Sequence, residues 1–450
     1  MINPMLTSLT QYGTAKKDFS EFLNRYENKR DIPTVAALCK KSYLYLAQIA
    51  NLQGDYSDAI SWYKRGLTFF PDDSKFKIEA NLALAKTHQQ LLELQLAAQA
   101  YQNAITQDEF NEFLKSHPQL MALPLNVARL QQLSSTNGLA LVSYRQAESY
   151  YHKIVEEKSG SELAFWAMIQ LANSYADQKQ WEKCLTTLKT ATSLYPNHQT
   201  IPEILLFVGT IYSDVKHEYL TAKSYYEKAF HESDISSVHA KAQLELGALR
   251  FKQKQNEEAR KKMRWVIEEY PREGRIGAMA QLAVAHSYEQ EGRWDRALVE
   301  FRWLMDTYPI TPEGVYAPLH IANHFKTLGE DDMAANAFTD ASERYFELIS
   351  KYPQSQLSAM AQQYLAICYA LSEKWEHALN AAEQLYEKYQ TTPQIAMGSQ
   401  ILLGQLYEKN GKIDAALQIY KDFLNKFSGH PLANQVRSRI TQLTGGNFKH

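Results

Sequence analysis

One spacing recurs along almost the whole chain. A small residue, usually alanine, stands four positions before a bulky residue, so both lie on one face of a helix. From Ala147 onward the pairs follow one another every 37 or 38 residues, apart from one step of 44. A period of this length predicts an array of small helical units that bury their apolar faces only by stacking. The pairs are Ala59/Tyr63, Ala97/Tyr101, Ala147/Tyr151, Cys184/Leu188, Ala222/Tyr226, Ala259/Met263, Ala297/Phe301, Ala334/Phe338, Ala378/Ala382 and Ala416/Tyr420.

The stretch from Ala278 to Pro309 shows what one unit contains. Two helices are predicted, separated at Gly292, because glycine accepts the left-handed conformation that often ends a helix. Pro309 closes the second helix. Ala285 and Ala297 are small, which lets the two helices approach closely. The predicted packing stripes are Gln281, Val284, Ala285 and Tyr288 in the first helix and Trp294, Ala297, Phe301 and Leu304 in the second.

The first helices repeat as well, as LANSY (171–175), VGTIY (208–212), LGALR (246–250), VAHSY (284–288), LAICY (365–369) and LGQLY (403–407). Together with the alanine-to-bulky spacing, this resembles the tetratricopeptide repeat family, whose pattern is W-x2-L-G-x2-Y, then A-x3-F, then P. The resemblance covers almost the whole chain. It implies an all-α fold, a right-handed superhelical solenoid of stacked antiparallel helix hairpins. Because the motif concerns packing, it specifies the fold and not the function.

Two features depart from the family pattern. The first aromatic residue is retained only as Tyr43; its place is elsewhere taken by Met168, Leu205, Gln243, Gln281, Pro318, Gln362 or Gln400. The period also exceeds the family's usual length of about 34 residues, and the extra residues follow tyrosine-proline pairs such as Tyr308-Pro309. This lengthened form is similar to the repeats of bacterial envelope proteins, such as the Tol-Pal cell division coordinator and the outer-membrane assembly lipoproteins.

The pattern predicts three regions. Residues 1–138 hold an N-terminal cap helix, two repeats and an irregular connector (112–138) with two prolines. Residues 139–430 hold one helix followed by a regular array of about seven repeats. Residues 431–450 form a capping helix and a tail. A seven-residue insertion after Val315 predicts a lengthened second helix that protrudes over 328–350, where a partner or a second copy of the chain could bind.

Composition excludes several classes of protein. The net charge of −2 gives no general attraction to nucleic acid, and no basic stripe follows the repeats. No apolar run is long enough to span a bilayer. Three cysteines cannot form a disulfide framework; Cys184 and Cys368 are expected to be buried, and Cys39 partly exposed. The first residues do not resemble a secretory signal, which favours a cytoplasmic protein, or one on the periplasmic face of a bacterial envelope if a leader was removed.

The sequence contains no recognisable catalytic or cofactor motif: no glycine-rich phosphate loop, no nucleophile elbow and no HExxH. We therefore predict a protein that is not an enzyme and has no cofactor. His320 and His324 lie one turn apart on one helix face, and His286 in the preceding repeat is a candidate third ligand. A zinc site needs three or four ligands and supporting contacts, so the sequence favours two polar helix residues without a metal.

In the tetratricopeptide repeat family the first helices line a concave groove, and the resemblance implies where a partner would lie here. Asn173, His286 and Asn323 would hydrogen-bond an extended peptide. Aromatic side chains would hold its side chains. The chaperone-binding members use basic residues and asparagines that are replaced here by Leu44, Gln48, Gln170 and Glu245. The candidate groove residues are Trp166, Asn173, Phe207, His286, Tyr316, His320, Asn323 and Tyr364.

The sequence thus predicts a non-enzymatic scaffold or adaptor that binds a protein or peptide partner in the groove. Two alternatives stay open. One is a self-associating structural component, and hence a homo-oligomer, of a larger assembly that could belong to the cell envelope. The other is an accessory or regulatory domain of an enzyme complex.

Overall fold

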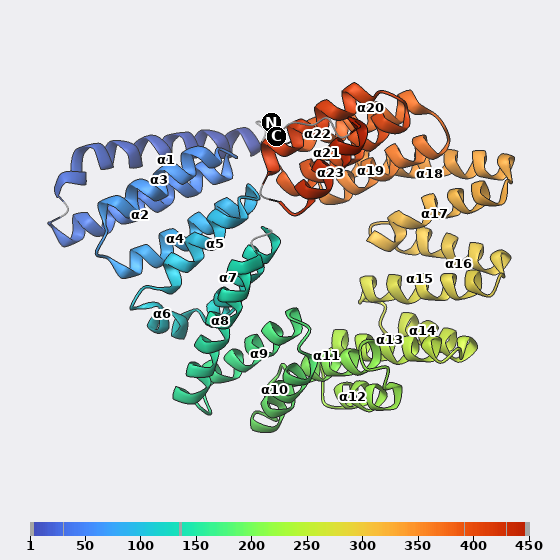
Figure 1. Cartoon of the computed structure of the whole chain (residues 1–450), viewed down its shortest axis with the longest axis horizontal. Helices are drawn as coiled ribbons and strands as arrows, with labels where there is room; N and C mark the ends of the chain where they lie inside the picture. Colours follow the sequence, from blue (N-terminus) through green and yellow to red (C-terminus); the bar gives the residue numbers. More distant parts are fainter. Residues whose placement is uncertain (1–3, 30, 135–136, 391, 429, 446–450) are drawn as a thin grey trace. The chain divides into compact units, whose positions relative to one another are not determined.

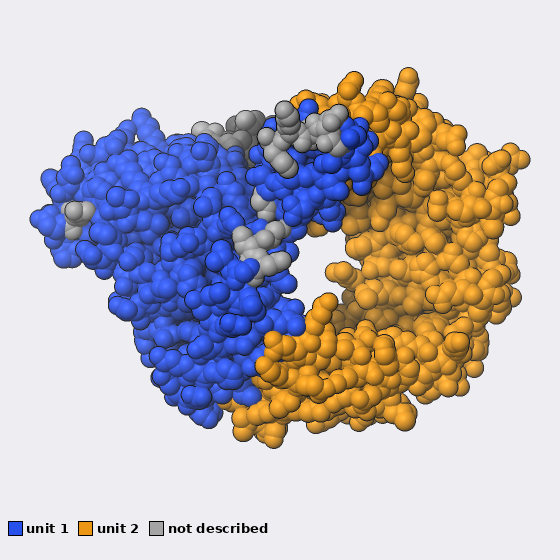
Figure 2. Space-filling model, in the orientation of Figure 1, with its two compact units in different colours: residues 1–178, 391–397, 420–450 blue, residues 179–390, 398–419 orange. Residues whose placement is uncertain are grey.

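The computed structural model describes residues 4–29, 31–134, 137–390, 392–428 and 430–445. The described residues form helices and turns and contain no strand, as the repeat pattern predicts. They divide into two compact units (Figure 2). Unit 1 comprises residues 1–178, 391–397 and 420–450, and unit 2 comprises residues 179–390 and 398–419. The boundary expected at residue 138 stays a prediction.

Unit 1 consists of helices joined by short turns (Figure 1). They are α1 (Pro4–Tyr26), η1 (Glu27–Lys29), α2 (Pro33–Leu52), α3 (Tyr56–Phe69), α4 (Ser74–Gln90), α5 (Leu94–Ile105), α6 (Phe110–Ser116), η2 (Pro118–Ala122), α7 (Leu123–Leu133), α8 (Asn137–Glu157), α9 (Glu162–Asp177) and α23 (Leu432–Leu443).

Unit 2 continues the pattern of first and second helices. It holds α10 (Trp181–Leu194), α11 (Ile201–Asp214), α12 (Tyr219–His231), α13 (Ser236–Lys252), α14 (Asn256–Glu269), α15 (Gly274–Gln290), α16 (Trp294–Thr307), α17 (Pro312–Leu328), α18 (Asp331–Lys351), α19 (Gln356–Leu371) and α20 (Trp375–Tyr389). Helices α21 (Pro393–Lys409) and α22 (Ile413–Phe427) contain residues of both units.

The alanine-to-bulky pairs form the core of the helix pairs, which confirms the sequence-based prediction. Both members of all ten pairs are buried. In unit 2, Ala297 and Phe301 of α16 are fully buried in a cluster that also contains Ala285 of α15. The small side chain admits the neighbouring helix, and the bulky one fills the space between successive helices, so stacking buries what a single hairpin would expose.

Buried glutamines explain why the family's first aromatic residue is dispensable here. Gln281 of α15 donates a hydrogen bond through Nε2 to the carbonyl oxygen of Glu300 in α16 (3.0 Å). In α19, Gln362 makes the same bond to the carbonyl of Ala381 in α20 (3.0 Å). Both glutamines are buried. A side chain-to-backbone bond therefore joins the two helices of these hairpins at the position where the tetratricopeptide repeat pattern has an aromatic residue.

Both ends of the described chain are helical, while their role as caps stays a prediction. Helix α1 packs Phe19 and Phe22 against a cluster that includes its own fully buried Leu23. It is followed by α2, which begins at Pro33. Helix α23 buries Ala433, Val436 and Ile440, and only part of the predicted tail lies within the described residues.

The connector expected to be irregular contains a helix. Residues Leu123–Leu133 form α7, which packs against α8 as a first helix packs against a second. Pro118 and Pro124 suggested a break, but both stand in the first turn of their helices, where proline is tolerated. Cys39 was also predicted wrongly: it is fully buried, as are Cys184 and Cys368.

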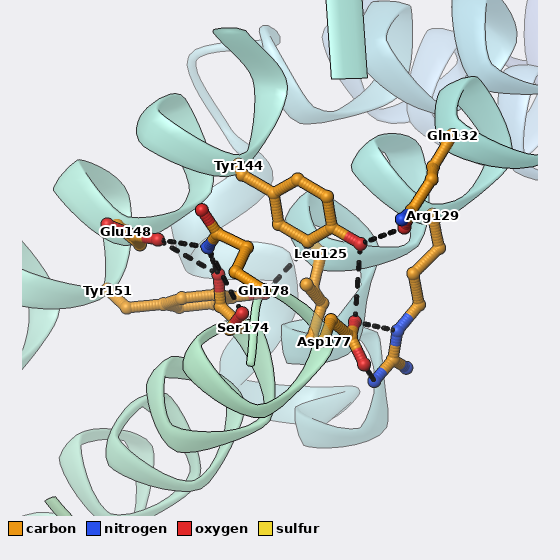
Figure 3. A network of polar contacts seen from close by, with 9 residues as sticks. All are labelled: Leu125, Arg129, Gln132, Tyr144, Glu148, Tyr151, Ser174, Asp177 and Gln178. Atoms are coloured by element: carbon orange, nitrogen blue, oxygen red, sulfur yellow. Dashed lines mark hydrogen bonds and ion pairs between the residues drawn. The ribbon is translucent and has the colours of Figure 1, made fainter. Parts of the chain in front are cut away.

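A polar network ties α7, α8 and α9 together within unit 1 (Figure 3). Arg129 of α7 binds Asp177 of α9 with two hydrogen bonds of 2.6 and 3.2 Å. Glu148 of α8 accepts a bond from Gln178, immediately after α9 (2.5 Å). The hydroxyl of Tyr144 donates to the side chain of Gln132 (2.7 Å). The guanidinium of Arg129 binds both carboxylate oxygens of Asp177. Two parallel bonds of this kind fix the angle between α7 and α9 as well as adding stability.

The hydroxyl of the buried Tyr151 bridges two backbone groups at the start of α7. It donates to the carbonyl of Met121 (3.0 Å) and accepts from the amide of Leu125 (3.1 Å). The bridge spans the turn that contains Pro124. Tyr345 of α18 does the same across Pro318 in α17: it donates to Val315 (3.0 Å) and accepts from Leu319 (3.1 Å).

These two bridges belong to a pair of similar segments. Four pairs of matching residues each lie 194 positions apart. They are Pro124 and Pro318, Tyr151 and Tyr345, the helix N-caps Ser161 and Ser355, and Trp181 and Trp375. Helices α8 and α18 are both 21 residues long. This confirms the lengthened helix predicted after Val315, and shows that it has a counterpart which the sequence analysis did not recognise. We infer an internal duplication.

No described helix is long and apolar enough to cross a membrane.

Candidate functional site

The predicted groove residues lie on first helices and are half-buried. Trp166 and Asn173 are on α9 in unit 1, and Trp166 donates a hydrogen bond to Glu162 of its own helix (2.7 Å). In unit 2, Phe207 is on α11, and Tyr364 of α19 stacks on the buried Tyr345 with ring centroids 6.0 Å apart. Tyr364 therefore has a packing role. Asn323 lies on α17.

Three predicted residues come together on adjacent first helices of unit 2. The imidazoles of His286 (α15) and His320 (α17) lie with ring centroids 5.2 Å apart. Tyr316 lies one turn before His320 and hydrogen-bonds it (2.7 Å from the hydroxyl to Nδ1). These residues surround a side chain that the sequence analysis missed, Glu289 of α15.

The carboxylate of Glu289 faces three imidazoles. Oε2 lies 2.9 Å from Nδ1 of His286 and 3.1 Å from Nε2 of His320. Oε1 lies 3.0 Å from the same Nε2 and 3.3 Å from Nδ1 of His324. We call His286, Glu289, His320 and His324 the Glu289 cluster. The signal for it was present in the sequence as a histidine and a glutamate three residues apart, followed in the next repeat by two histidines four residues apart.

Aromatic residues hold the cluster in place. The ring of His324 is stacked on the indole of Trp294, the first residue of α16, with an interplanar angle of 9° and centroids 3.4 Å apart. Fully buried Phe301 packs against His286 and His320, with centroid distances of 5.2 and 4.8 Å. The cluster therefore has an apolar wall on one side and side chains fixed in orientation, while its members keep between 19% and 34% of their side-chain surface exposed.

The charges of the cluster follow from burial and from these contacts. Burial lowers the pKa of His320 below its ordinary value, although Glu289 works in the opposite direction, and this favours the neutral imidazole. For Glu289, burial alone would raise the pKa, but the hydrogen bonds and charges of His286 and His320 together lower it. The geometry places one carboxylate against three imidazole rings, and carboxylate oxygen and imidazole nitrogen are both ligands for metal ions.

A second half-buried carboxyl lies on the first helix of another repeat. Burial raises the pKa of Glu245 in α13, and Asp214 at the end of α11 adds to the effect. A carboxyl whose pKa is raised in the folded state destabilises the fold above that pKa, while below the ordinary value of 4.5 both states are protonated and the cost disappears.

We therefore expect Glu245→Gln to raise the melting midpoint at pH 7.5 and to leave it close to that of the wild type near pH 4. Thermal melts of both proteins over this pH range test the prediction. A gain of the same size at both pH values would show that the effect does not come from ionisation.

The repeats match known family models. A tetratricopeptide repeat model matches residues 9–74, and a second one matches residues 166–198, 241–272 and 399–430. The matched segment 241–272 corresponds to a helix pair of unit 2, α13 and α14. These segments are tetratricopeptide repeats. Among curated proteins, no sequence matches the chain significantly.

Solved structures of tetratricopeptide repeat proteins are also similar to the chain. Yeast Tom70 is 15% identical, with a TM-score of 0.43 and coverage of 97% of this chain and 96% of that one. A tetratricopeptide repeat protein from Parabacteroides merdae is 17% identical, with a TM-score of 0.34 and coverage of 62% and 98%. Similarity of this degree says nothing about function. The matches give no support to the predicted resemblance to bacterial envelope proteins.

Proposed function

We propose that the chain is a non-enzymatic scaffold that binds a protein or peptide segment along its first helices. The observation that carries the proposal is that these helices present apolar side chains which their own packing leaves partly uncovered. Met279 of α15 is 42% exposed, and Phe207 of α11 and Tyr316 of α17 are half-buried. Partly covered aromatic and methionine side chains are the usual anchors of protein interfaces.

A polar residue beside these anchors supports a peptide ligand. Asn323 on α17 is half-buried and offers a side-chain amide. An extended peptide needs such groups for its backbone, because backbone amides and carbonyls lose water on binding. The ligand we propose is a segment with apolar side chains at intervals, bound in an extended or helical form.

Site-specific photo-crosslinking tests this proposal. A benzophenone amino acid is placed at Met279, and in a matched control at Val299, which is 61% exposed on the second helix α16. We expect cross-links to a partner protein from position 279 and not from 299. The variant Phe207→Ala/Met279→Ala should recover at least about tenfold less of that partner, while Leu220→Ala/Val299→Ala should recover it normally. Equal recovery by both double variants would exclude the first helices as the binding surface.

Self-association is the alternative that a specific observation favours. On the lengthened helix α18, Met333 and Phe346 are 49% and 50% exposed, and exposed apolar residues of this size often mark an interface. In that case a benzophenone at Phe346 would cross-link two copies of the chain, and sedimentation would show a mass that rises with concentration. A self-associating structural protein, for example in a bacterial envelope, would then replace the scaffold proposal. A role as an accessory subunit of an enzyme complex is a separate alternative.

A further inference from the structure

The Glu289 cluster has the composition of a metal site. Imidazole and carboxylate are the ligands that zinc and related divalent transition metals prefer. His286, Glu289 and His320 each offer one ligand atom, and these atoms all lie within 4.8 Å of one another. We propose that the chain binds one divalent transition-metal ion, preferably zinc, through His286, Glu289 and His320.

The spacing of the ligand atoms supports one shared ion. In a tetrahedral zinc site with bonds of about 2.0–2.1 Å, neighbouring ligand atoms are about 3.3 Å apart. In the cluster, Oε2 of Glu289 lies 2.9 Å from Nδ1 of His286 and 3.1 Å from Nε2 of His320, and the ligand atoms of the three residues all lie within 4.8 Å of one another. Adjustments of the side-chain torsion angles would bring these three ligand atoms around one ion.

The contacts around the cluster are those that hold metal ligands in place. When His320 binds a metal through Nε2, its Nδ1 carries the proton and donates to the hydroxyl of Tyr316, which already lies at 2.7 Å. The stacked indole of Trp294 fixes the ring of His324, and Phe301 closes the side toward the core. These three aromatic residues are supporting contacts of the kind that a metal site needs. The sequence pattern did not reveal them, which was a reason to expect no metal there.

Three imidazole rings from two repeats converge on one half-buried carboxylate. The lone pairs of this carboxylate can accept one hydrogen bond from each ring, so the metal-free cluster is held together by hydrogen bonds. A divalent ion would satisfy the carboxylate and the nitrogen lone pairs at once. It would also join α15 to α17, the first helices of two successive repeats.

Zinc binding to the full-length chain is the test. The untagged protein is stripped with a chelator and titrated with Zn²⁺ in competition with a chromophoric indicator. We expect one ion per chain with a Kd of about 1 μM or tighter. Glu289→Gln and His320→Gln should each weaken binding by at least about 100-fold. The matched control His377→Gln changes an exposed histidine on α20 and should bind zinc like the wild type.

Two further measurements separate loss of a ligand from loss of the fold. Tyr316→Phe removes no ligand, and we expect it to weaken binding by about tenfold. Bound Co²⁺ should give a visible absorption spectrum that Glu289→Gln abolishes, with circular dichroism unchanged. The proposal is overturned if the stripped wild-type protein binds no zinc in the titration. It is also overturned if the ligand variants bind as tightly as the wild type.

Discussion

Tyr345→Phe is expected to destabilise unit 2 by about 2–4 kcal/mol, although it removes a single oxygen atom from a buried ring. The hydroxyl satisfies two backbone groups of α17, the carbonyl of Val315 and the amide of Leu319. A buried backbone group left without a partner costs about 1–3 kcal/mol. Burial raises the pKa of Tyr345, so the hydroxyl stays protonated and remains a donor at every pH at which the protein is studied.

The physical reason for the bridge is Pro318, inside α17. Proline has no amide hydrogen and its ring pushes the helix open, so the next amide no longer reaches the carbonyl four residues before it. The hydroxyl fills the opening. We therefore expect Tyr345→Phe to cost much less in a Pro318→Ala background, where Leu319 can bond to Val315 directly, and a double-mutant cycle measures the difference.

Thermal melts and hydrogen exchange of the α17 amides are the measurements, since a two-unit repeat protein need not unfold in one step. A loss of 2–4 kcal/mol corresponds to a drop in melting midpoint of roughly 4–16 °C for a unit of this size. Tyr226→Phe is the control: the ring is equally buried, but its hydroxyl lies 3.4 Å from a side-chain hydroxyl, that of Thr210. If Tyr345→Phe and Tyr226→Phe lost the same amount of stability, the bond of Tyr345 to the backbone would contribute no more than an ordinary side-chain hydrogen bond.

The features that the sequence predicted well depend on local spacing. Ala297 and Phe301 lie one turn apart, and a hairpin that must bury both has one way to do so, by stacking. The same reasoning placed the second helices of all the repeats and the lengthened helix α18. Helix α7 was missed because Pro118 and Pro124 suggested a break, whereas a proline in the first turn of a helix leaves the helix intact.

The candidate site was predicted in part. His286, Tyr316 and His320 were selected because the family resemblance places them on one face, and the structure brings them together. Glu289 was not selected, because its spacing from His286 shows only that the two share a face of α15. Its contact with His320 and His324 follows from where α15 lies against α17. Tyr364 was selected for the same reason as Tyr316, but it packs on Tyr345. Whether an aromatic residue is an anchor or a core residue depends on its neighbours in space, which spacing alone does not reveal.

The turn between α16 and α17 depends on Gly314. A Cβ at this position would stand 2.0 Å from the carbonyl oxygen of Tyr308 and 2.8 Å from its carbon, both backbone atoms that cannot rotate away. That oxygen accepts hydrogen bonds from the amide and the hydroxyl of Thr311, at 3.1 and 2.9 Å. Thr311 is also the N-cap of α17 and accepts the bond from the amide of Gly314 (3.1 Å). Moving the carbonyl therefore disturbs the cap as well.

We expect Gly314→Ala to destabilise unit 2 by about 3 kcal/mol, at the upper end of what overpacking costs. Gly274→Ala is the control, because a Cβ at the first residue of α15 meets no atom within 4 Å, and alanine there should leave stability unchanged or raise it slightly. Thermal melts of the two variants give the comparison, and equal midpoints would show that the turn gives way easily.

The next turn of the same kind shows how the clash could be relieved. Between α18 and α19, Tyr352-Pro353-Gln354-Ser355 has the length of Tyr308-Pro309-Ile310-Thr311, and the buried Ser358 takes the place of Gly314. There Gln354 adopts a positive φ of 62°. Ile310 is not among the residues with positive φ, and a β-branched residue resists that conformation. We expect Ile310→Gly to restore much of the stability lost in Gly314→Ala, because glycine lets the turn take the wider path. A double variant no more stable than Gly314→Ala would mean that the shape of this turn is set by the packing of α16 against α17 and not by residue 310.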